Sequence, residues 1–474
     1  MPAAAQQAPS AQAPSIQAPS IQARVESELA KAATGTRYGL VVADADGREL
    51  IAINPDDRFI PASNTKVVTT AAAWATIPDF DQPDSRGGAA VRIEGRDVIL
   101  TGRGDARLSS APDCTIDCLA QLADAIAART RRIRNIIGDA TLFPDERWSS
   151  GMSWNNIPSR SGTAIAALTI DDNETGATVT PTAAGQPPRI DHPGYFVVDN
   201  RAVTVAGGKT DLNYDRLPLE RTLRITGTIA LDAKAQQLRF GIDDPAHFAA
   251  WRLAALLRER GVRVGGTITS RYRPVSASDD PASRTAAPPR PADPQWLAVL
   301  TPPPLADDVR ITNKVSQNLH AELLLRRAGL VSGTGSVADG QARVDAMFAA
   351  AGAPRTAYDF SDGSGMSTYN RIAPRGMVAL LRWIADQPWG AAWRATLPVG
   401  GVDGTLARRF RGTALEGRIF AKTGSLNATS ALAGYLIARS GRTLTFAVYA
   451  NDIPSGASGT PAMDAALVAI ADAN

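Results

Sequence analysis

The sequence predicts an α/β fold of the α+β type that is interrupted by a long β-rich insert. Near the start, the helical spacing of Val25 and Leu29 precedes two strand-like runs, Tyr38–Ala43 and Glu49–Ile53, which a turn joins into a hairpin. Residues 81–294 then contain mainly short β-like runs between Gly, Pro and Asp turns. Helical periodicity returns after this stretch. The three observations together indicate one α+β domain into which other domains are inserted.

Residues 1–23 form a low-complexity leader built on an imperfect Gln-Ala-Pro-Ser repeat. Ala, Pro, Gln and Ser cannot bury a core, so we expect a disordered spacer or a processed leader, with order beginning near Arg24. Further on, residues 59–62 lead into Ser63. The stretch Val67–Ala75 is mostly small and apolar, which is typical of a buried helix.

Changes in composition give the expected domain boundaries. Residues 24–80 form the first part of the main domain, residues 81–294 form inserted β-rich domains, and residues 295–474 form the second part. Within the insert, Ala246–Arg260 has the pattern of a helix. The stretch Pro274–Pro294 is rich in Pro, Ser and Ala, as a connector back to the main domain would be. We expect the insert to frame a cleft and to do no chemistry.

The second part of the main domain alternates between helices and strands. Asn318–Ala328 and Met377–Asp386 have helical periodicity, and Ala462–Ile470 is an apolar final helix. Ser430–Ala438 and Thr443–Tyr449 are adjacent apolar strands with Ser-Gly between them, which indicates a hairpin.

Composition narrows the classes of function. The chain has 474 residues, of which 44% are hydrophobic and 20% charged, as in soluble globular proteins. A net charge of +3 without any basic run gives no reason to expect a nucleic-acid partner. No stretch has the length of a transmembrane helix, and no signal peptide is visible. Cys114 and Cys118 are too few for a zinc site; they form either a local disulfide in an oxidising compartment or two unpaired thiols.

Lysine is rare in this chain. Only six of its 50 cationic residues are lysines, and the others are arginines. The six are Lys31, Lys66, Lys209, Lys234, Lys314 and Lys422. Since arginine remains protonated while lysine can lose its proton when it is desolvated, a retained lysine indicates a place where an amine is needed.

Three short motifs carry the chemistry, and the first is Ser63-Asn64-Thr65-Lys66. If Ser63 starts a helix, Lys66 lies one turn further on the same face. Its amine can take the proton of the serine hydroxyl, provided that burial or a neighbouring cation keeps the amine neutral. The tetrapeptide alone is a weak signal, because many helices begin with serine and contain lysine.

The second and third motifs are Ser316-Gln317-Asn318 and Lys422-Thr423-Gly424, the latter followed by Ser425. Ser316 brings a hydroxyl that can relay a proton, or it caps the helix that follows. A strand with a cation and a hydroxyl at its edge suits a substrate carboxylate, and we expect Gly424 to admit close approach of a ligand. Each motif alone is weak, but their combination in this order is specific.

In this order, S-x-x-K, S-x-N and K-T-G resemble the motifs of penicillin-binding proteins and serine β-lactamases. The flanks of these motifs, and the segments 362–365, 370–374 and 400–406, are similar to the class C low-molecular-mass group, the D-alanyl-D-alanine carboxypeptidase/endopeptidases. The long insert fits that group better than the β-lactamases. The resemblance covers nearly all of the chain after residue 24. It implies a five-stranded antiparallel sheet with helices on both sides.

The resemblance also implies roles for individual residues. Ser63 would attack the carbonyl between two D-alanines, with Lys66 as general base, while Ser316 relays a proton to the leaving group and Asn318 holds the substrate backbone. Lys422 keeps the field positive. With Thr423, it binds the terminal carboxylate, next to Gly424 on the same strand. The backbone N–H groups of Ser63 and Ser425 would form the oxyanion hole. Gln317 departs from the family, in which Asp or Asn is more usual.

The implied activity is hydrolysis of peptidoglycan stem peptides in the periplasm or another extracytoplasmic space, without a metal or organic cofactor and with covalent inhibition by β-lactams. A serine β-lactamase and a non-catalytic peptidoglycan-binding module are the alternatives. Peripheral membrane association and oligomeric state stay open. Asp139 and Phe143 either face the stem peptide or form a wall of the insert, and we expect His320 to be structural rather than part of a Ser-His-Asp triad.

Overall fold

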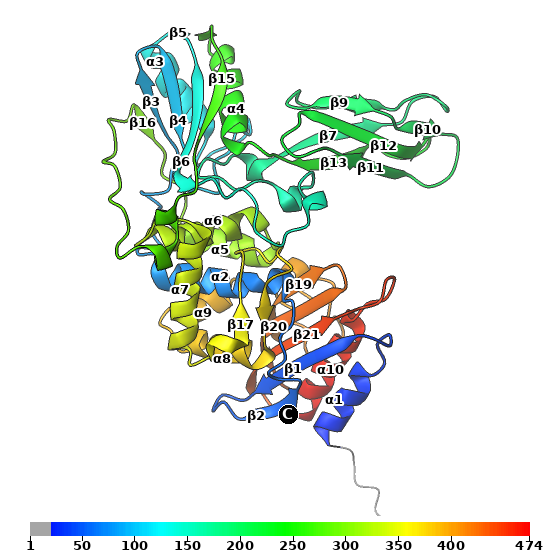
Figure 1. Cartoon of the computed structure of the whole chain (residues 1–474). Coiled ribbons are helices and arrows are strands. Elements are labelled where there is room, and N and C mark those ends of the chain that lie inside the picture. The colour runs from blue at the N-terminus through cyan, green and yellow to red at the C-terminus, as the bar shows by residue number, and fades with distance from the viewer. Residues whose placement is uncertain (1–19) are drawn as a thin grey trace, which may run out of the picture.

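A five-stranded antiparallel sheet lies at the centre of the main domain in the computed structural model, which describes residues 20–474 (Figure 1). Its strand order joins the two ends of the sequence, because the first strand pairs with the last. In spatial order the strands are β19 (Ile419–Leu426), β20 (Thr429–Ile437), β21 (Thr443–Asn451), β1 (Arg37–Ala43) and β2 (Glu49–Ile53). The expected sheet is thus confirmed.

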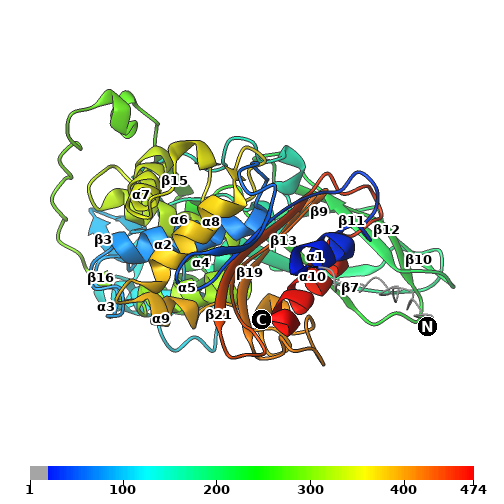
Figure 2. The same ribbon diagram turned by 90° about the horizontal axis from the view of Figure 1, so that it is seen from below.

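Helices cover both faces of this sheet (Figure 2). One face carries α1 (Ile21–Leu29) and α10 (Thr460–Ala473). The opposite face carries the other helices of the main domain, which are α2 (Thr65–Thr76), α5 (Leu305–Lys314), α6 (Asn318–Leu330), α7 (Val337–Ala350), α8 (Pro374–Ala385) and α9 (Gly390–Arg394). The hairpin β17 (Tyr358–Asp359) and β18 (Arg371–Ile372) lies beside them.

Alternation along β21 shows why both faces are covered. Phe446 and Val448 point into the core under α1 and α10, while Ala447 and Tyr449 point into the core under α2 and α8. All four side chains are buried. A strand with period-two side chains that are apolar on both faces needs a layer of helices on each side.

The leader was expected to extend to residue 23, but residues 20–23 belong to the first helix. Ser20 Oγ accepts a hydrogen bond of 3.2 Å from Ala23 N and caps α1, in which Val25 and Leu29 are buried. An N-cap serine satisfies one of the free N–H groups of the first turn, which fixes where the helix begins. The rest of the expected leader, residues 1–19, lies outside the described residues.

The first part of the insert is an α/β unit rather than a purely β domain. Its five-stranded sheet has the order β15 (Ile268–Arg273), β6 (Ile136–Pro144), β4 (Asp97–Thr101), β3 (Ala90–Glu94) and β16 (Ala298–Val299). Two helices pack with it, the expected α4 (Pro245–Glu259) and the unexpected α3 (Leu119–Arg129). A short pair, β5 (Arg132–Ile133) and β14 (Arg263–Val264), extends it. Strand β16 lies beyond residue 294, the expected end of the insert.

The second part of the insert is an arm of short strands that projects to one side of the molecule (Figure 1). Its strands are β7 (Glu174–Thr180), β8 (Arg189–Asp191), β9 (Val197–Asn200), β10 (Val203–Val205), β11 (Asp211–Asp215), β12 (Thr222–Ala230) and β13 (Gln236–Gly241). They form a four-stranded and a three-stranded sheet.

The structure also shows the state of the two cysteines and whether a described helix could cross a membrane. Cys114 and Cys118 are joined in a disulfide just before α3, so the alternative of two unpaired thiols is wrong. Within residues 20–474, we find no helix with the length and apolar character needed to cross a bilayer.

Candidate active site

Ser63 lies on a tight turn at the start of α2. The turn, Ala62–Asn64, is a short 3-10 helix that continues directly into the helix, and Ala62 adopts the left-handed conformation with φ +48°. Asn64 fastens the turn to the sheet: its Nδ2 donates to the carbonyl of Lys422 (2.6 Å), and its Oδ1 accepts from the Tyr449 hydroxyl (3.2 Å). The serine hydroxyl is therefore presented from a rigid support at the edge of β19.

Lys66 lies one helical turn after Ser63, as its spacing predicts, and is completely buried. Its Nζ is 2.9 Å from Ser63 Oγ, 2.7 Å from Asn318 Oδ1 and 2.5 Å from the Ser364 carbonyl. The last two partners are acceptors, so a neutral amine gives them its two hydrogens and keeps its lone pair for the O–H of Ser63. The geometry therefore fits an amine that accepts the serine proton.

Burial governs the protonation state of Lys66. It lowers the pKa of Lys66 from 10.5 to about 7, although the nearby carboxylates Asp362 and Glu322 raise it. Desolvation disfavours the charged ammonium and outweighs the attraction of the two carboxylates. The amine is therefore substantially neutral at neutral pH, which general base catalysis requires.

The second motif joins the helices α5 and α6. Asn318, the first residue of α6, accepts from Lys66 through Oδ1 and donates through Nδ2 to the carbonyl of Ser161 in the insert (2.9 Å). Ser316 is held in the left-handed conformation, with φ +63°. The alternative that Ser316 caps α6 is wrong, because the cap is Gln317, whose Oε1 accepts from Leu319 N (3.1 Å). The residue that departs from the family pattern thus has a structural task.

The third motif lies on β19. Lys422 is completely buried, and its Nζ donates to Ser316 Oγ and to the Thr423 carbonyl, both at 2.9 Å. Burial, followed by the charge of Lys66, lowers its pKa well below the usual value. The structure therefore places the lysine expected from K-T-G against the hydroxyl expected from S-x-N.

Close packing explains why position 424 is a glycine, which the sequence analysis did not foresee. A Cβ there would lie 2.3 Å from the carbonyl oxygen of Pro61 and 2.9 Å from Asn64 N. Only glycine therefore allows β19 to lie this close to the nucleophile turn. The protein's own backbone is thus a close neighbour of Gly424. Ser425, one residue further, is exposed.

The loop 362–365 completes the site. In the sequence it served only as evidence for the family resemblance. Asp362–Gly365 carries the Ser364 carbonyl to Lys66, and Gly365 lies so close to the nucleophile turn that a Cβ would be 1.9 Å from the Ala62 carbonyl oxygen. Glu322 holds this loop, since its Oε1 accepts from Gly363 N (3.0 Å) and Ser364 N (2.9 Å). Its position one turn after Asn318 on α6 is the sequence signal that could have found it.

Asp362 shapes the same loop from inside. Its carboxylate accepts from Gly365 N (2.9 Å), Ser367 N (2.6 Å) and Asn370 Nδ2 (2.6 Å). Burial and the charge of Glu322 raise the pKa of Asp362 to about 6. It is therefore mainly ionised at neutral pH.

The insert was expected to frame the cleft, but it also forms hydrogen bonds with residues around Lys66. Besides the Ser161 carbonyl on Asn318, Ser149 Oγ donates to Asp362 (3.2 Å), and the Gly151 carbonyl accepts from Thr368 N (3.0 Å). These contacts come from one segment that follows β6. The insert therefore fixes two of the elements that surround Lys66.

Other residues singled out in the sequence lie away from the reacting groups. Phe143 is buried in the core of the insert, and Asp139 accepts from Thr141 N (3.1 Å) inside the same unit, so both form a domain wall. His320 is buried between Asp308 and Asp172, with its Nε2 3.0 Å from Asp172 Oδ1. It has no contact with Ser63, in agreement with a structural role.

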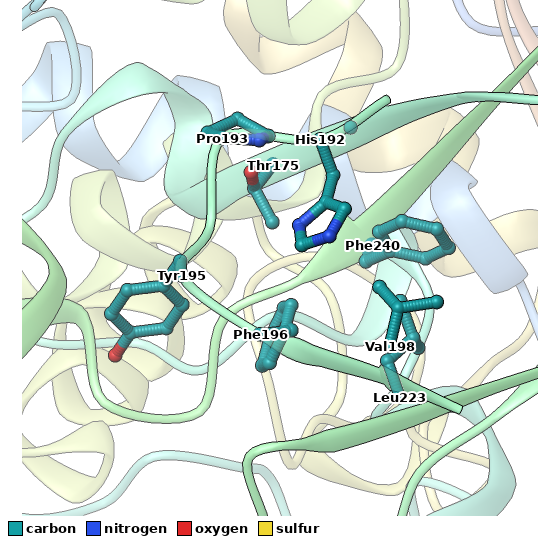
Figure 3. A pocket seen from close by; sticks show the side chains of 9 residues that line it. Thr175, His192, Pro193, Tyr195, Phe196, Val198, Leu223 and Phe240 are labelled. Atoms are coloured by element: carbon teal, nitrogen blue, oxygen red, sulfur yellow. The ribbon is translucent and has the colours of Figure 1, made fainter. Parts of the chain in front are cut away.

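Two pockets lie in the insert, and neither is a better candidate for the active site. Figure 3 shows the smaller, an apolar pocket of about 10 Å³ beside Tyr195 and Phe240, which has room for about one water molecule. The larger, of about 400 Å³, is lined by several arginines, but Arg216 is already paired with Asp243. Among residues 20–474, no group of three or more His, Cys, Asp or Glu side chains is arranged to hold a metal ion.

Comparison with known proteins agrees with this geometry. The family model described as D-Ala-D-Ala carboxypeptidase 3 (S13) matches residues 21–474. A D-alanyl-D-alanine carboxypeptidase of Actinomadura sp. (strain R39) is 33% identical over 93% of this chain and 82% of its own length. The carboxypeptidase DacB of Haemophilus influenzae is 25% identical, over 90% of this chain and 88% of its own.

A solved structure confirms the fold. The crystal structure of penicillin-binding protein 4 (dacB) from Haemophilus influenzae superimposes with a TM-score of 0.77 at 22% identity, covering 93% of this chain and 97% of that one. The match includes the insert as well as the main domain, since it spans nearly the whole of both chains. On the strength of the family model and the Actinomadura relative, the chain belongs to the D-Ala-D-Ala carboxypeptidase 3 (S13) family.

Proposed function

We propose that this serine D-Ala-D-Ala carboxypeptidase cleaves the terminal peptide bond of peptidoglycan stem peptides, and D-centred cross-links of the same kind, through an acyl-enzyme on Ser63. The observation that carries the assignment is the 2.9 Å contact between Ser63 Oγ and the buried Lys66 Nζ. A serine hydroxyl is a weak nucleophile until a neighbouring base takes its proton. Here the base, its depressed pKa and its partners are all present.

Acylation uses the three motifs in turn. Ser63 Oγ forms a bond to the carbonyl carbon of the penultimate residue while its proton passes to Lys66 Nζ. The backbone N–H groups of Ser63 and Ser425 receive the developing oxyanion, a contribution of roughly 3–4 kcal/mol for each donor. The C–N bond then breaks, and Ser316 Oγ, which accepts from Lys422 Nζ, relays to the leaving amine the proton that Lys66 took, so that Ser316 keeps its hydroxyl and Lys66 is neutral again.

Deacylation reverses the proton path. A water molecule attacks the ester carbonyl while Lys66 takes its proton, and the departing Ser63 oxygen is then protonated again. In this proposal Asn318 holds the substrate backbone beside the base, a role supported by its hydrogen-bond distance to Lys66 and by its contact with the insert. The Lys422 ammonium and the hydroxyl of Thr423 would bind the terminal carboxylate of the substrate.

β-Lactams should react at the same serine. The Haemophilus influenzae penicillin-binding protein 4 has been solved in complex with a β-lactam, at 22% identity and a TM-score of 0.70 to this chain. We propose that a penicillin acylates Ser63 in the same manner as a peptide and leaves slowly, because the motifs supply no dedicated carboxylate for deacylation.

An extracytoplasmic location fits both the substrate and the chemistry of the chain. Peptidoglycan lies outside the cytoplasmic membrane, and the disulfide Cys114–Cys118 persists in an oxidising compartment.

The decisive experiment is intact mass measurement after incubation with benzylpenicillin, followed by peptide mapping. We expect one stable adduct, located on Ser63 and absent from the Ser63→Ala variant. An adduct on another residue would refute the assignment. Loss of the adduct within seconds would favour a β-lactamase, and absence of any adduct would favour a binding module.

A further inference from the structure

A hydroxyl that the motifs do not include lies beside the third motif. Thr405 Oγ1 is 2.8 Å from Thr423 Oγ1, and Thr405 is exposed while Thr423 is half-buried. Thr405 belongs to the short 3-10 turn Gly404–Leu406, within the segment that resembled the family at 400–406. Two hydroxyls thus stand side by side at the open edge of β19.

The turn that carries Thr405 is tied to the segment that carries the second motif. Asp403 forms an ion pair with Lys314 Nζ (2.6 Å) and accepts from Val399 N through its other oxygen (2.9 Å). Gly404 is left-handed, with φ +56°, and a Cβ there would lie 2.6 Å from the carbonyl oxygen of Lys314. Thr405 is therefore held between the end of α5 and strand β19.

Lys314 is one of the six lysines of this arginine-rich chain, and catalysis as proposed does not use it. It lies two residues before Ser316, so its ion pair with Asp403 connects the S-x-N segment to the turn beside K-T-G. A compact ammonium fits this half-buried place, where the planar fork of arginine would need more room.

The chemistry of a carboxylate explains what two adjacent hydroxyls can do. A carboxylate is an acceptor with two oxygens and is bound best by two converging donors. Thr423 donates to Thr405, so only one of the two hydroxyl protons is used between them. An incoming carboxylate can accept hydrogen bonds from both hydroxyls at once. A neutral amide or ester in its place gains less binding free energy from the two hydroxyls.

We propose that Thr405 is a substrate-binding residue which, together with Thr423, receives the carboxylate next to the scissile bond, and that Asp403 and Lys314 are its positioning residues. This rests on the proposed role of the K-T-G strand in carboxylate binding. Thr405 then favours substrates with a free carboxylate on the leaving group over otherwise identical neutral ones.

The test compares benzylpenicillin with its methyl ester, because the two share the reacting ring carbonyl and differ in the carboxylate. A hydrogen bond to a charged group contributes about 1.5–3 kcal/mol, so Thr405→Val should slow acylation by the acid about 10- to 100-fold, mainly through weaker binding. Acylation by the ester should stay within about twofold of the parent. Thr405→Ser should restore the parental rates, and Asp403→Asn should show a smaller loss with the same preference for the acid.

Thr178→Val is the matched control, because the Thr178 hydroxyl is also hydrogen-bonded to a side chain, that of Gln237, but lies in the insert strand β7. Equal losses of Thr405→Val on acid and ester, or parental rates on both, would overturn the inference while leaving the proposed function intact. If the parent protein itself forms no adduct on Ser63, the proposed function and this inference both fail.

Discussion

Replacing Lys66 by arginine tests the central chemical claim. The structure gives Lys66 a pKa of about 7 in place of 10.5. At pH 7 about half of the side chains are then neutral, whereas an ordinary lysine would be neutral in only about one molecule in three thousand. Burial therefore raises the fraction of usable base by roughly a thousandfold. A guanidinium is protonated at every pH that the protein tolerates.

We therefore expect Lys66→Arg to lower the rate of acylation by labelled penicillin by about a thousandfold, within the range known for loss of a general base. In the parent protein the rate should rise with pH through about 7 and level off above it, because the deprotonated amine is the active form. Lys422→Arg should be milder, since its proposed role needs a positive charge. Lys209→Arg and Lys234→Arg, both in the insert, are the controls.

The assay is the rate of labelled acylation at several pH values, with thermal melting to show that each variant is folded. A folded Lys66→Arg protein that acylates at the parental rate would refute Lys66 as the base. A parental rate that is flat between about pH 5 and pH 9 would refute the depressed pKa.

Three further predictions concern the surroundings of the base. Glu322→Gln removes a charge that raises the pKa of Lys66, so the midpoint of the pH–rate profile should move to lower pH. The pKa of His320 is raised to about 9 from 6.5, so about 3 kcal/mol of stability should be present below pH 6.5 and lost as the pH rises through 9; urea unfolding of His320→Gln should lack this loss. Reducing Cys114–Cys118 should cost about 2 kcal/mol of unfolding free energy while the acylation rate stays unchanged.

The sequence predicted those parts of the site that depend on the type of side chain. Ser63 and Lys66 are one turn apart, so their contact follows from helix geometry alone. Ser316 and Lys422 are far apart along the chain, and their contact follows from the family pattern rather than from local spacing. Ser63 meets them because strands from both ends of the sequence pair in one sheet, which no local pattern contains.

The parts that were missed are mostly backbone groups and buried supports. The carbonyls of Ser161 and Ser364 hold Asn318 and Lys66, but every residue has a carbonyl, so residue type gives no signal for either. The contact of Gly424 with the Pro61 carbonyl was also missed, because the two residues are distant in the sequence. Helix α3 was overlooked among β-like runs, although its buried residues Leu119, Leu122, Ala123 and Ile126 have helical spacing.

The reactivity that we propose for Ser63 therefore depends on elements that lie far from its own motif. The pKa of Lys66 is lowered because water is excluded from it, and the groups that replace water are Asn318 and the Ser364 carbonyl. Asn318 is in turn held by the insert through the Ser161 carbonyl, and the loop that carries Ser364 is held by Glu322. S-x-x-K on an exposed helix would lack this desolvation and would keep a protonated lysine. For this reason the tetrapeptide is a weak signal alone, and it becomes specific only with the rest of the fold around it.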